Sequence, residues 1–151
     1  MFVNTYAAQN ANNQVNFDAY LAESFSPDIQ RSELSDPAKI TIWATNDTGP
    51  AGYYQLVFDR SAPVDLNVAS VCELKRFYVD QPWQGSGLAY RQIEHAIDQA
   101  RARADGLWLG VWSENAHAIR FYSRAGLQRR GEVTFHLGAD PQQDDVYALT
   151  W

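Results

Sequence analysis

The sequence contains a single cysteine, Cys72, and no long run of apolar residues. One cysteine cannot form a disulfide within the chain, and no cysteine cluster is available to hold zinc. We therefore expect Cys72 to be a buried, inert thiol. No stretch approaches the roughly 20 apolar residues of a membrane span, and the N-terminus lacks a charged-then-apolar export signal. These absences predict a soluble, cytoplasmic protein with neither a membrane partner nor a metal site.

Positive charge is also scarce. Lysine and arginine number 12 against 18 aspartates and glutamates, which gives a formal net charge of -6 and a pI of about 4.9. Such a chain repels phosphate backbones and attracts cations, so we expect no nucleic-acid partner. The 151 residues are 46% hydrophobic and 13% aromatic. That composition fits one compact domain spanning 1–151, of α/β or mixed α+β class.

Hydrophobic spacing gives the order of the elements. Phe17, Tyr20, Leu21 and Phe25 recur at helical spacing, and with the segment led by Pro27 they predict two or three short helices in the first forty residues. Further helices are predicted at 87–104 and 116–125, and strands at 39–45, 51–58, 71–79, 107–112, 127–137 and 146–151. Residues 46–50 between the first two strands have the composition of a hairpin turn.

The strand at 71–79 contains a phase slip. Cys72 and Leu74 are two residues apart, as are Phe77 and Val79, whereas Leu74 and Phe77 are three apart. One inserted residue, a β-bulge, produces such a slip and leaves backbone groups open to an extended ligand. An ordinary strand with a mixed face explains the pattern equally well.

Two glycines, Gly85 and Gly87, lie between this strand and the amphipathic helix at 87–104. Glycines allow successive N–H groups at a helix N-terminus to face one anion, and a pyrophosphate is the natural ligand. The alternative is a plain tight turn. The segment has neither the Gly-Lys-Ser/Thr of a P-loop nor the third glycine of a dinucleotide fingerprint.

These residues carry a family resemblance. Gln84-x-x-Gly87-x-Ala89 resembles the Gln/Arg-x-x-Gly-x-Gly/Ala motif of the Gcn5-related N-acetyltransferases, and the segment 115–127 resembles the family's second motif, Asn-x-x-Ala-x-x-Phe-Tyr-x-x-x-Gly-Phe. The resemblance covers residues 40–151. It extends to the PaiA-like polyamine acetyltransferases through Tyr6, Asn10, Tyr20, Leu21, Phe25 and the segments 110–112, 135–138 and 140–145.

The resemblance implies a mixed sheet whose two central strands splay at the bulge, with the pantetheine arm of acetyl-CoA in the gap. Family members normally begin with a strand, whereas Met1 here already stands at the start of the first helix, so we expect that strand to be missing. The residues that the resemblance assigns to acetyl-CoA are Phe77, Tyr78 and Val79 for the pantetheine, Gln84, Gly85, Ser86, Gly87, Leu88, Ala89 and Tyr90 for the pyrophosphate turn, and Asn115 and Arg124 for the cofactor arm. For Arg124, a solvated helix charge is an equal alternative.

Acetyl transfer to an amine requires two proton transfers. An alkyl ammonium with a pKa near 10.4 must lose a proton before it attacks, and the leaving thiolate must gain one. The resemblance implies that Tyr122 is the general acid, since a tyrosine hydroxyl donates without being ionised. The alternative is that Tyr122 only packs in the apolar stripe of its helix.

The base is less clearly marked. Some branches carry a glutamate at the position of Gly110, which has no carboxylate. We expect Glu73 to replace it, acting through water, although Glu73 could instead pair with a neighbouring Lys75 or Arg76. Weaker candidates are Glu114 and His117, and His95 and His136 are interpreted as structural.

The sequence thus predicts an enzyme that moves the acetyl group of acetyl-CoA to a primary amine. The expected substrate is a small polycation of the spermidine class, bound near the acidic residues of the N-terminal helices and the Asp144–Asp145 end. A peptide N-terminus or another small amine is the runner-up. A catalytically silent acyl-CoA-binding module and a general α+β interaction protein are the alternatives of other classes. A homodimer is left open.

Overall fold

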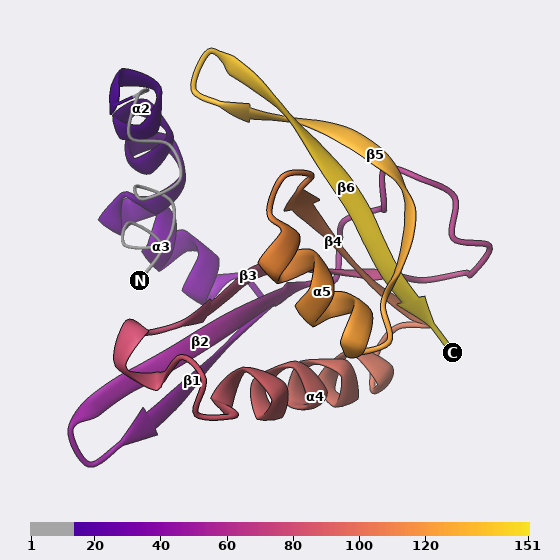
Figure 1. The fold of residues 1–151 in the computed structure, drawn as a ribbon, viewed down its shortest axis with the longest axis horizontal. Coiled ribbons are helices and arrows are strands. Elements are labelled where there is room, and N and C mark those ends of the chain that lie inside the picture. The colour runs from indigo at the N-terminus through magenta and orange to yellow at the C-terminus, as the bar shows by residue number, and fades with distance from the viewer. Residues whose placement is uncertain (1–13) are drawn as a thin grey trace.

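The computed structural model describes residues 14–151, which form one mixed β-sheet flanked by helices (Figure 1). Within these residues the sheet has six strands in the order β1-β2-β3-β4-β6-β5. The helices are α2 (Gln14–Phe25), α3 (Pro27–Ser35), α4 (Leu88–Arg101) and α5 (Ala116–Arg124), with a 3-10 turn η1 (Gln81–Trp83). The strands are β1 (Lys39–Asn46), β2 (Gly49–Val57), β3 (Cys72–Val79), β4 (Gly106–Trp112), β5 (Gln128–Leu137) and β6 (Asp140–Thr150).

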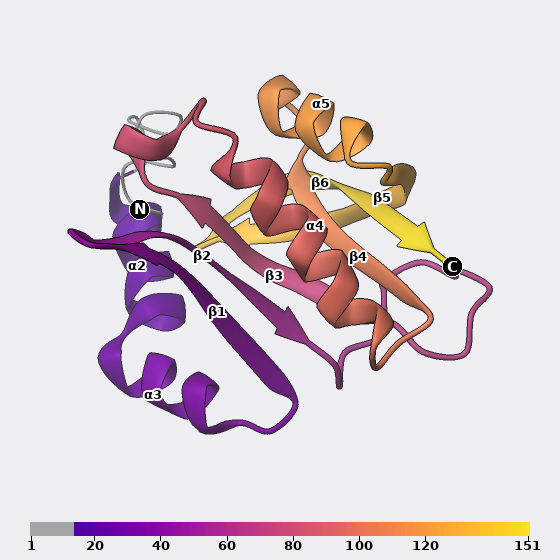
Figure 2. The same ribbon diagram turned by 90° about the horizontal axis from the view of Figure 1, so that it is seen from below.

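One face of the sheet carries α4 and α5 and is called the α4 face below. Side chains alternate across a strand, and Tyr54, Leu56 and Leu74 all point to this face. There they pack with Ile93 and Ala96 of α4 in the main apolar cluster. The sheet and α4 therefore share a continuous core, and the N-terminus of α4 lies at its edge (Figure 2).

The opposite face, called the α3 face, is covered in two parts. Over β1, β2 and β3 lies α3, whose Glu33 reaches Gln55 and Arg76. Over β4 and β6 lies the loop 58–71, whose Leu66 packs with Trp108 in a second, smaller cluster.

Most of the predicted elements are confirmed to within a few residues, but the last strand is not. The predicted range 146–151 is wrong because β6 begins at Asp140, where it pairs with Leu137 across the turn. Its first residues are polar, and pairing with β5 rather than apolar spacing holds them in the strand. The helix predicted at 87–104 ends earlier, at Arg101. The expected absence of a first strand, with Tyr6 and Asn10, concerns residues outside those described.

None of the helices in the described part of the chain is long and apolar enough to cross a membrane. Cys72 is fully buried, and burial raises its pKa to about 12, as a thiol inside an apolar core requires.

Candidate active site

The two central strands separate after a short parallel contact. β3 and β4 pair only at Cys72 with Leu107 and at Glu73 with Trp108. Beyond these pairs the strands diverge, as Figure 2 shows. We call this opening the fork. Beyond the two pairs, the facing edges of β3 and β4 have no strand partner in each other.

The bulge predicted in β3 is present. Leu74 pairs with Leu56 of β2 and Arg76 pairs with the preceding residue Gln55, so Lys75 is the inserted residue. The insertion changes the phase of the side chains. Arg76 is thereby directed to the α3 face, whereas Phe77 packs on the α4 face, 5.6 Å between ring centroids from Phe121 of α5.

The turn before α4 offers free N–H groups. Gly85 and Gly87 adopt positive φ angles of 79° and 83°, which favour glycine. Within residues 14–151 the N–H groups of Gly85, Gly87 and Ala89 have no hydrogen-bond partner. Gln84 donates from Nε2 to the carbonyl of Val79 at 3.2 Å and so ties the turn to the end of β3. This helix N-terminus can take an anion.

The side chains of α5 and α4 meet beside the fork. Asn115 caps α5, its Oδ1 accepting from the N–H of Ala118 at 3.1 Å, which leaves its amide N–H groups for a ligand. Tyr90 packs against Phe121 with ring centroids 5.2 Å apart and the rings tilted by 58°. Arg124 is exposed in the last turn of α5 and lies in no ion pair among the described residues.

Tyr122 lies next to Phe121 and contacts Phe77 edge-on, with ring centroids 6.1 Å apart. Its hydroxyl has no hydrogen-bond partner among the described residues. Burial raises the pKa of Tyr122 well above the ordinary value for tyrosine, so the hydroxyl stays protonated at neutral pH. A protonated hydroxyl beside the fork can donate to a leaving group there.

Glu73 lies at the vertex of the fork and points to the α3 face, as does its partner Trp108. Its carboxylate forms an ion pair with Arg60 of the loop 58–71, with Oε2 3.2 Å from Nη1. The expected alternative pairing with Lys75 or Arg76 is wrong, because both of those cations bind Glu33. Burial raises the pKa of Glu73, and Arg60 partly opposes that shift.

The weaker base candidates are not enclosed. Glu114 and His117 are both exposed at the start of α5. His95 Nδ1 lies 2.8 Å from the hydroxyl of Tyr54, which fits the structural role predicted for it. His136 is exposed on β5.

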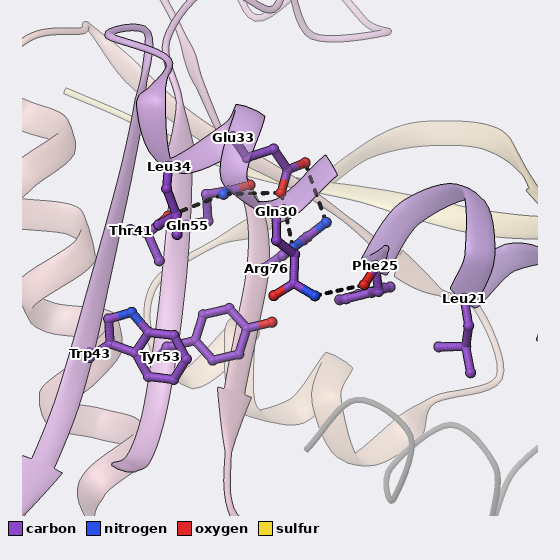
Figure 3. A pocket seen from close by; sticks show the side chains of 10 residues that line it. All are labelled: Leu21, Phe25, Gln30, Glu33, Leu34, Thr41, Trp43, Tyr53, Gln55 and Arg76. Carbon is purple, nitrogen blue, oxygen red and sulfur yellow. Dashed lines mark hydrogen bonds and ion pairs between the residues drawn. The ribbon is translucent and has the colours of Figure 1, made fainter. Parts of the chain in front are cut away.

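A pocket of about 310 Å³ opens on the α3 face (Figure 3). At its base, Glu33 binds Arg76 with Oε2 3.0 Å from Nη1, and Lys75 with Oε1 2.8 Å from Nζ. The other lining residues are Leu21, Phe25, Gln30, Leu34, Thr41, Trp43, Tyr53 and Gln55. Sequence spacing does not reveal this pocket, because its residues come from five separate elements and form no motif.

Comparison with known proteins decides the family. The model of the Acetyltransferase (GNAT) family matches residues 5–127. The chain belongs to this family. An uncharacterised N-acetyltransferase of Lactobacillus delbrueckii subsp. lactis is 31% identical over 126 residues, which cover 83% of this chain and 72% of that relative. The predicted resemblance and enzyme class are therefore confirmed, and acetyl-CoA is the co-substrate of this GNAT chain.

Two further proteins bear on the fold and the branch. The PaiA N-acetyltransferase of Thermoplasma acidophilum, solved in complex with coenzyme A, has a TM-score of 0.74 at 15% identity, covering 99% of this chain and 86% of that one. It confirms the predicted mixed-sheet fold. The spermine/spermidine N(1)-acetyltransferase of Bacillus subtilis is 34% identical over only 65 residues, 42% of this chain and 43% of that relative. The roles of individual residues in this GNAT chain stay predictions.

Proposed function

We propose that this GNAT enzyme acetylates a small primary amine at the fork, with Tyr122 protonating the leaving sulfur. The observation that carries the proposal is the position of Tyr122. Its ring packs on Phe77 at the unpaired edge of β3, and its hydroxyl is protonated and free of competing partners among the described residues. A positioned acid of this kind lowers the barrier to C–S cleavage.

The acetyl donor is held from the α4 face in this proposal. Its pyrophosphate takes the N–H groups of the Gly85–Gly87 turn at the N-terminus of α4, where the helix dipole favours negative charge. The pantetheine follows the β3 edge along Phe77, Tyr78 and Val79, where pairing with β4 has ended. The side-chain NH2 of Asn115, whose Oδ1 caps α5, contributes a donor nearby.

The acceptor enters from the α3 face in this proposal, since α4 and α5 cover the other side. The pocket of Figure 3 lies on that face, with Arg76 of β3 in its lining. Its one carboxylate, that of Glu33, is held by Lys75 and Arg76. The pocket therefore supplies aromatic walls rather than a free negative charge. The sequence assigns the base to Glu73, and that assignment stays a prediction.

A polyamine acceptor is the finer part of the proposal. Its support is the partial similarity to the Bacillus subtilis spermine/spermidine enzyme, together with the net charge of -6. The charged neighbours of the fork limit how selectivity could arise. Asp145, one of the residues expected to hold a polycation, is engaged by Arg129 at 2.8 Å. Preference for a polycation would then depend on the electrostatic field of the whole chain more than on contact with one carboxylate.

The test is release of free thiol from acetyl-CoA in the presence of polyamines, amino acids, aminoglycosides and peptides with free N-termini. The chain's own thiol adds little background because Cys72 is buried. Turnover with at least one amine above the amine-free blank is the expected result. A CoA-dependent rise in melting temperature without turnover would identify a silent acyl-CoA-binding module instead. No CoA effect at all would leave the general interaction protein.

A further inference from the structure

We propose that Asp144 is the catalytic base of this enzyme, accepting the proton of the acceptor amine on the α3 face of the fork. This inference rests on the proposed function, because it assigns a role within the same acetyl transfer. Residue 110 on β4 has no carboxylate, and Asp144 on the neighbouring strand β6 would supply one in its place.

The register of β4 and β6 brings Gly110 and Asp144 close together. Gly110 pairs with Val146, and Trp112 pairs with Asp144. Gly110 and Asp144 are therefore diagonal neighbours across the two strands. The Asp144 side chain leans toward Gly110, so that a Cβ built on Gly110 would lie 3.2 Å from Asp144 Oδ2. The space above Gly110 is thus filled by a carboxylate from residue 144. Since β3 leaves β4 after the pair of Glu73 and Trp108, Gly110 lies where β4 borders the fork.

Side-chain alternation places this carboxylate on the correct face. Tyr147 belongs to the core of the α4 face, whereas Val146 and Trp108 belong to the cluster of the α3 face. Asp144 shares the phase of Val146 and so points to the α3 face. An amine entering from that face would meet Asp144 while Tyr122 acts from the α4 face. The two groups would flank the reacting thioester from opposite sides.

Asp144 is also a carboxylate near the fork that forms no ion pair with a described residue. Its Oδ1 is buried without a hydrogen bond. The neighbouring charged groups are already matched. Glu73 Oε2 is likewise buried without a hydrogen bond, but it lies 3.2 Å from Arg60 Nη1 in an ion pair. Asp145 and Glu132 both bind Arg129 of β5. Leaving a buried carboxylate unpaired is unfavourable, and function is a reason to keep it.

The titration of Asp144 suits a base. Burial, with a smaller contribution from the negative charge of Asp145, raises its pKa to about 6. The carboxylate is therefore largely ionised at neutral pH yet much more basic than an exposed aspartate. General bases work best with a pKa near the operating pH. Glu73 is disfavoured by comparison, because a proton on its carboxylate would weaken the ion pair with Arg60.

The proposed step is balanced as follows. Asp144 takes one proton from the ammonium and later passes it to solvent. The neutral nitrogen attacks the thioester carbonyl, a C–N bond forms, and the C–S bond breaks with its electron pair on sulfur. Tyr122 gives its proton to that sulfur. The second nitrogen proton restores the tyrosine through water, which leaves the N-acetyl amine and the free thiol of CoA.

The direct test is the rate profile against pH for Asp144→Asn, which keeps the shape and removes the base. We expect kcat/KM to fall about 10²-fold or more and the acidic limb near pH 6 to disappear, while the dissociation constant for acetyl-CoA is unchanged. Glu132→Gln is the matched control. It removes one negative charge from the adjacent strand β5, and the acidic limb of its rate profile should remain.

A relocation variant separates catalysis from structure. The variant combines Asp144→Gly with Gly110→Glu. The first substitution empties the space next to residue 110, and the second places a carboxylate there from β4. The backbone of Gly110 has no positive φ, so a side chain is tolerated there. We expect this double variant to recover at least tenfold in kcat/KM over Asp144→Gly alone. A purely structural role for Asp144 predicts no recovery.

The outcomes are distinguishable. If the wild-type chain acetylates an amine and folded Asp144→Asn keeps the acidic limb, the inference is wrong and the proposed function stands. Loss of the limb in Glu73→Gln, with an intact limb in Asp144→Asn, would assign the base to Glu73. If the wild-type chain turns over no amine at all, the proposed function fails, and the role of Asp144 fails with it.

Discussion

Tyr122 contributes its ring and its hydroxyl to different parts of the molecule. The ring belongs to the aromatic group that joins α5 to β3, through contacts with Phe77 and Phe121. The hydroxyl makes no hydrogen bond among the described residues. Both interpretations that the sequence allowed, core packing and acid catalysis, are therefore compatible with the same position, and a substitution that removes only the oxygen can separate them.

We predict that Tyr122→Phe retains the fold and the affinity for acetyl-CoA but lowers kcat by about 10²- to 10⁴-fold, the usual contribution of a positioned acid. The ring still packs, and no hydrogen bond to a described residue is lost. Single-turnover kinetics and a CoA titration would measure the two effects. Tyr147→Phe, which removes a hydroxyl from the same core cluster, serves as the control. Wild-type turnover in Tyr122→Phe would show that the hydroxyl is not the acid.

Asp144 provides a second prediction, on stability. Its folded-state pKa of about 6 lies above the ordinary 3.8. Folding therefore disfavours the charged form, and the penalty is absent below the unfolded pKa and complete above the folded one. We expect Asp144→Asn to raise the free energy of unfolding at pH 8 by about 1–2 kcal/mol, after discounting for partial exposure. Urea denaturation at pH 8 and pH 4 would measure it, and the gain should shrink at pH 4. An equal gain at both values would contradict the raised pKa.

These two residues differ in how far the sequence could predict them. The tyrosine lies inside a local motif of thirteen residues, and the bulge at Lys75 is visible as a slip in a single strand. The relation of Asp144 to Gly110 depends instead on the register of two strands distant in sequence. No periodicity along the chain reveals that register, which is why the aspartate was expected only to attract substrate.

At the scale of elements, the start of α4 is defined by conformation rather than by side chains. Gly87 is its N-cap, in the left-handed region, and has no side chain to cap the helix. Ser86 Oγ accepts from the N–H of Leu88 at 3.3 Å, while the N–H groups of Gly87 and Ala89 have no partner among the described residues. These remaining N–H groups next to the fork are consistent with a binding role.

We predict that Gly87→Val raises the dissociation constant of acetyl-CoA at least tenfold, about 1.4 kcal/mol, while the protein stays folded. A valine has room, since a Cβ there meets only Arg91 Nη1 at 3.9 Å, but it disfavours the positive φ and so misaligns the N–H groups. Calorimetric titration with CoA would measure the change. Gly126→Val places the same strain at φ 96° beyond α5 and should bind CoA normally. Equal affinities in the two folded variants would exclude the turn from the site.

Strand β6 shows where element prediction from the sequence stops. Its apolar half, from Val146 onward, was predicted, and its polar half was not. The polar residues 140–145 have low intrinsic strand preference and are held by pairing with β5 and, from Asp144 onward, with β4. The half that the sequence missed is the half that carries Asp144.

At the scale of the whole molecule, the surplus of negative charge is only partly available to a ligand. Several carboxylates around the fork and the pocket are paired, namely Glu33, Glu73 and Asp145. The remaining field is the sum of more distant charges, with a net value of -6. A field of this kind acts over tens of ångströms at low salt and is screened within about 10 Å at 0.1 M salt. The cytoplasmic location stays a prediction, and the oligomeric state stays open.

This charge distribution leads to the last prediction, on the acceptor. Spermidine should exceed pentylamine in kcat/KM at least tenfold at low salt, about 1.4 kcal/mol of differential transition-state stabilisation. Cadaverine, which differs from pentylamine by one terminal ammonium, should fall between them. Because Glu33, Glu73 and Asp145 are paired, the preference should depend on long-range attraction more than on a contact. It should therefore shrink as salt rises from about 0.05 to 0.5 M and the Debye length shortens. Steady-state kinetics with the three amines at both salt concentrations would decide. Equal efficiencies at both would make the polyamine proposal wrong, while acetyl transfer to another amine would stand. A preference that salt leaves unchanged would point instead to a direct contact, and Asp144 would then be the first residue to substitute.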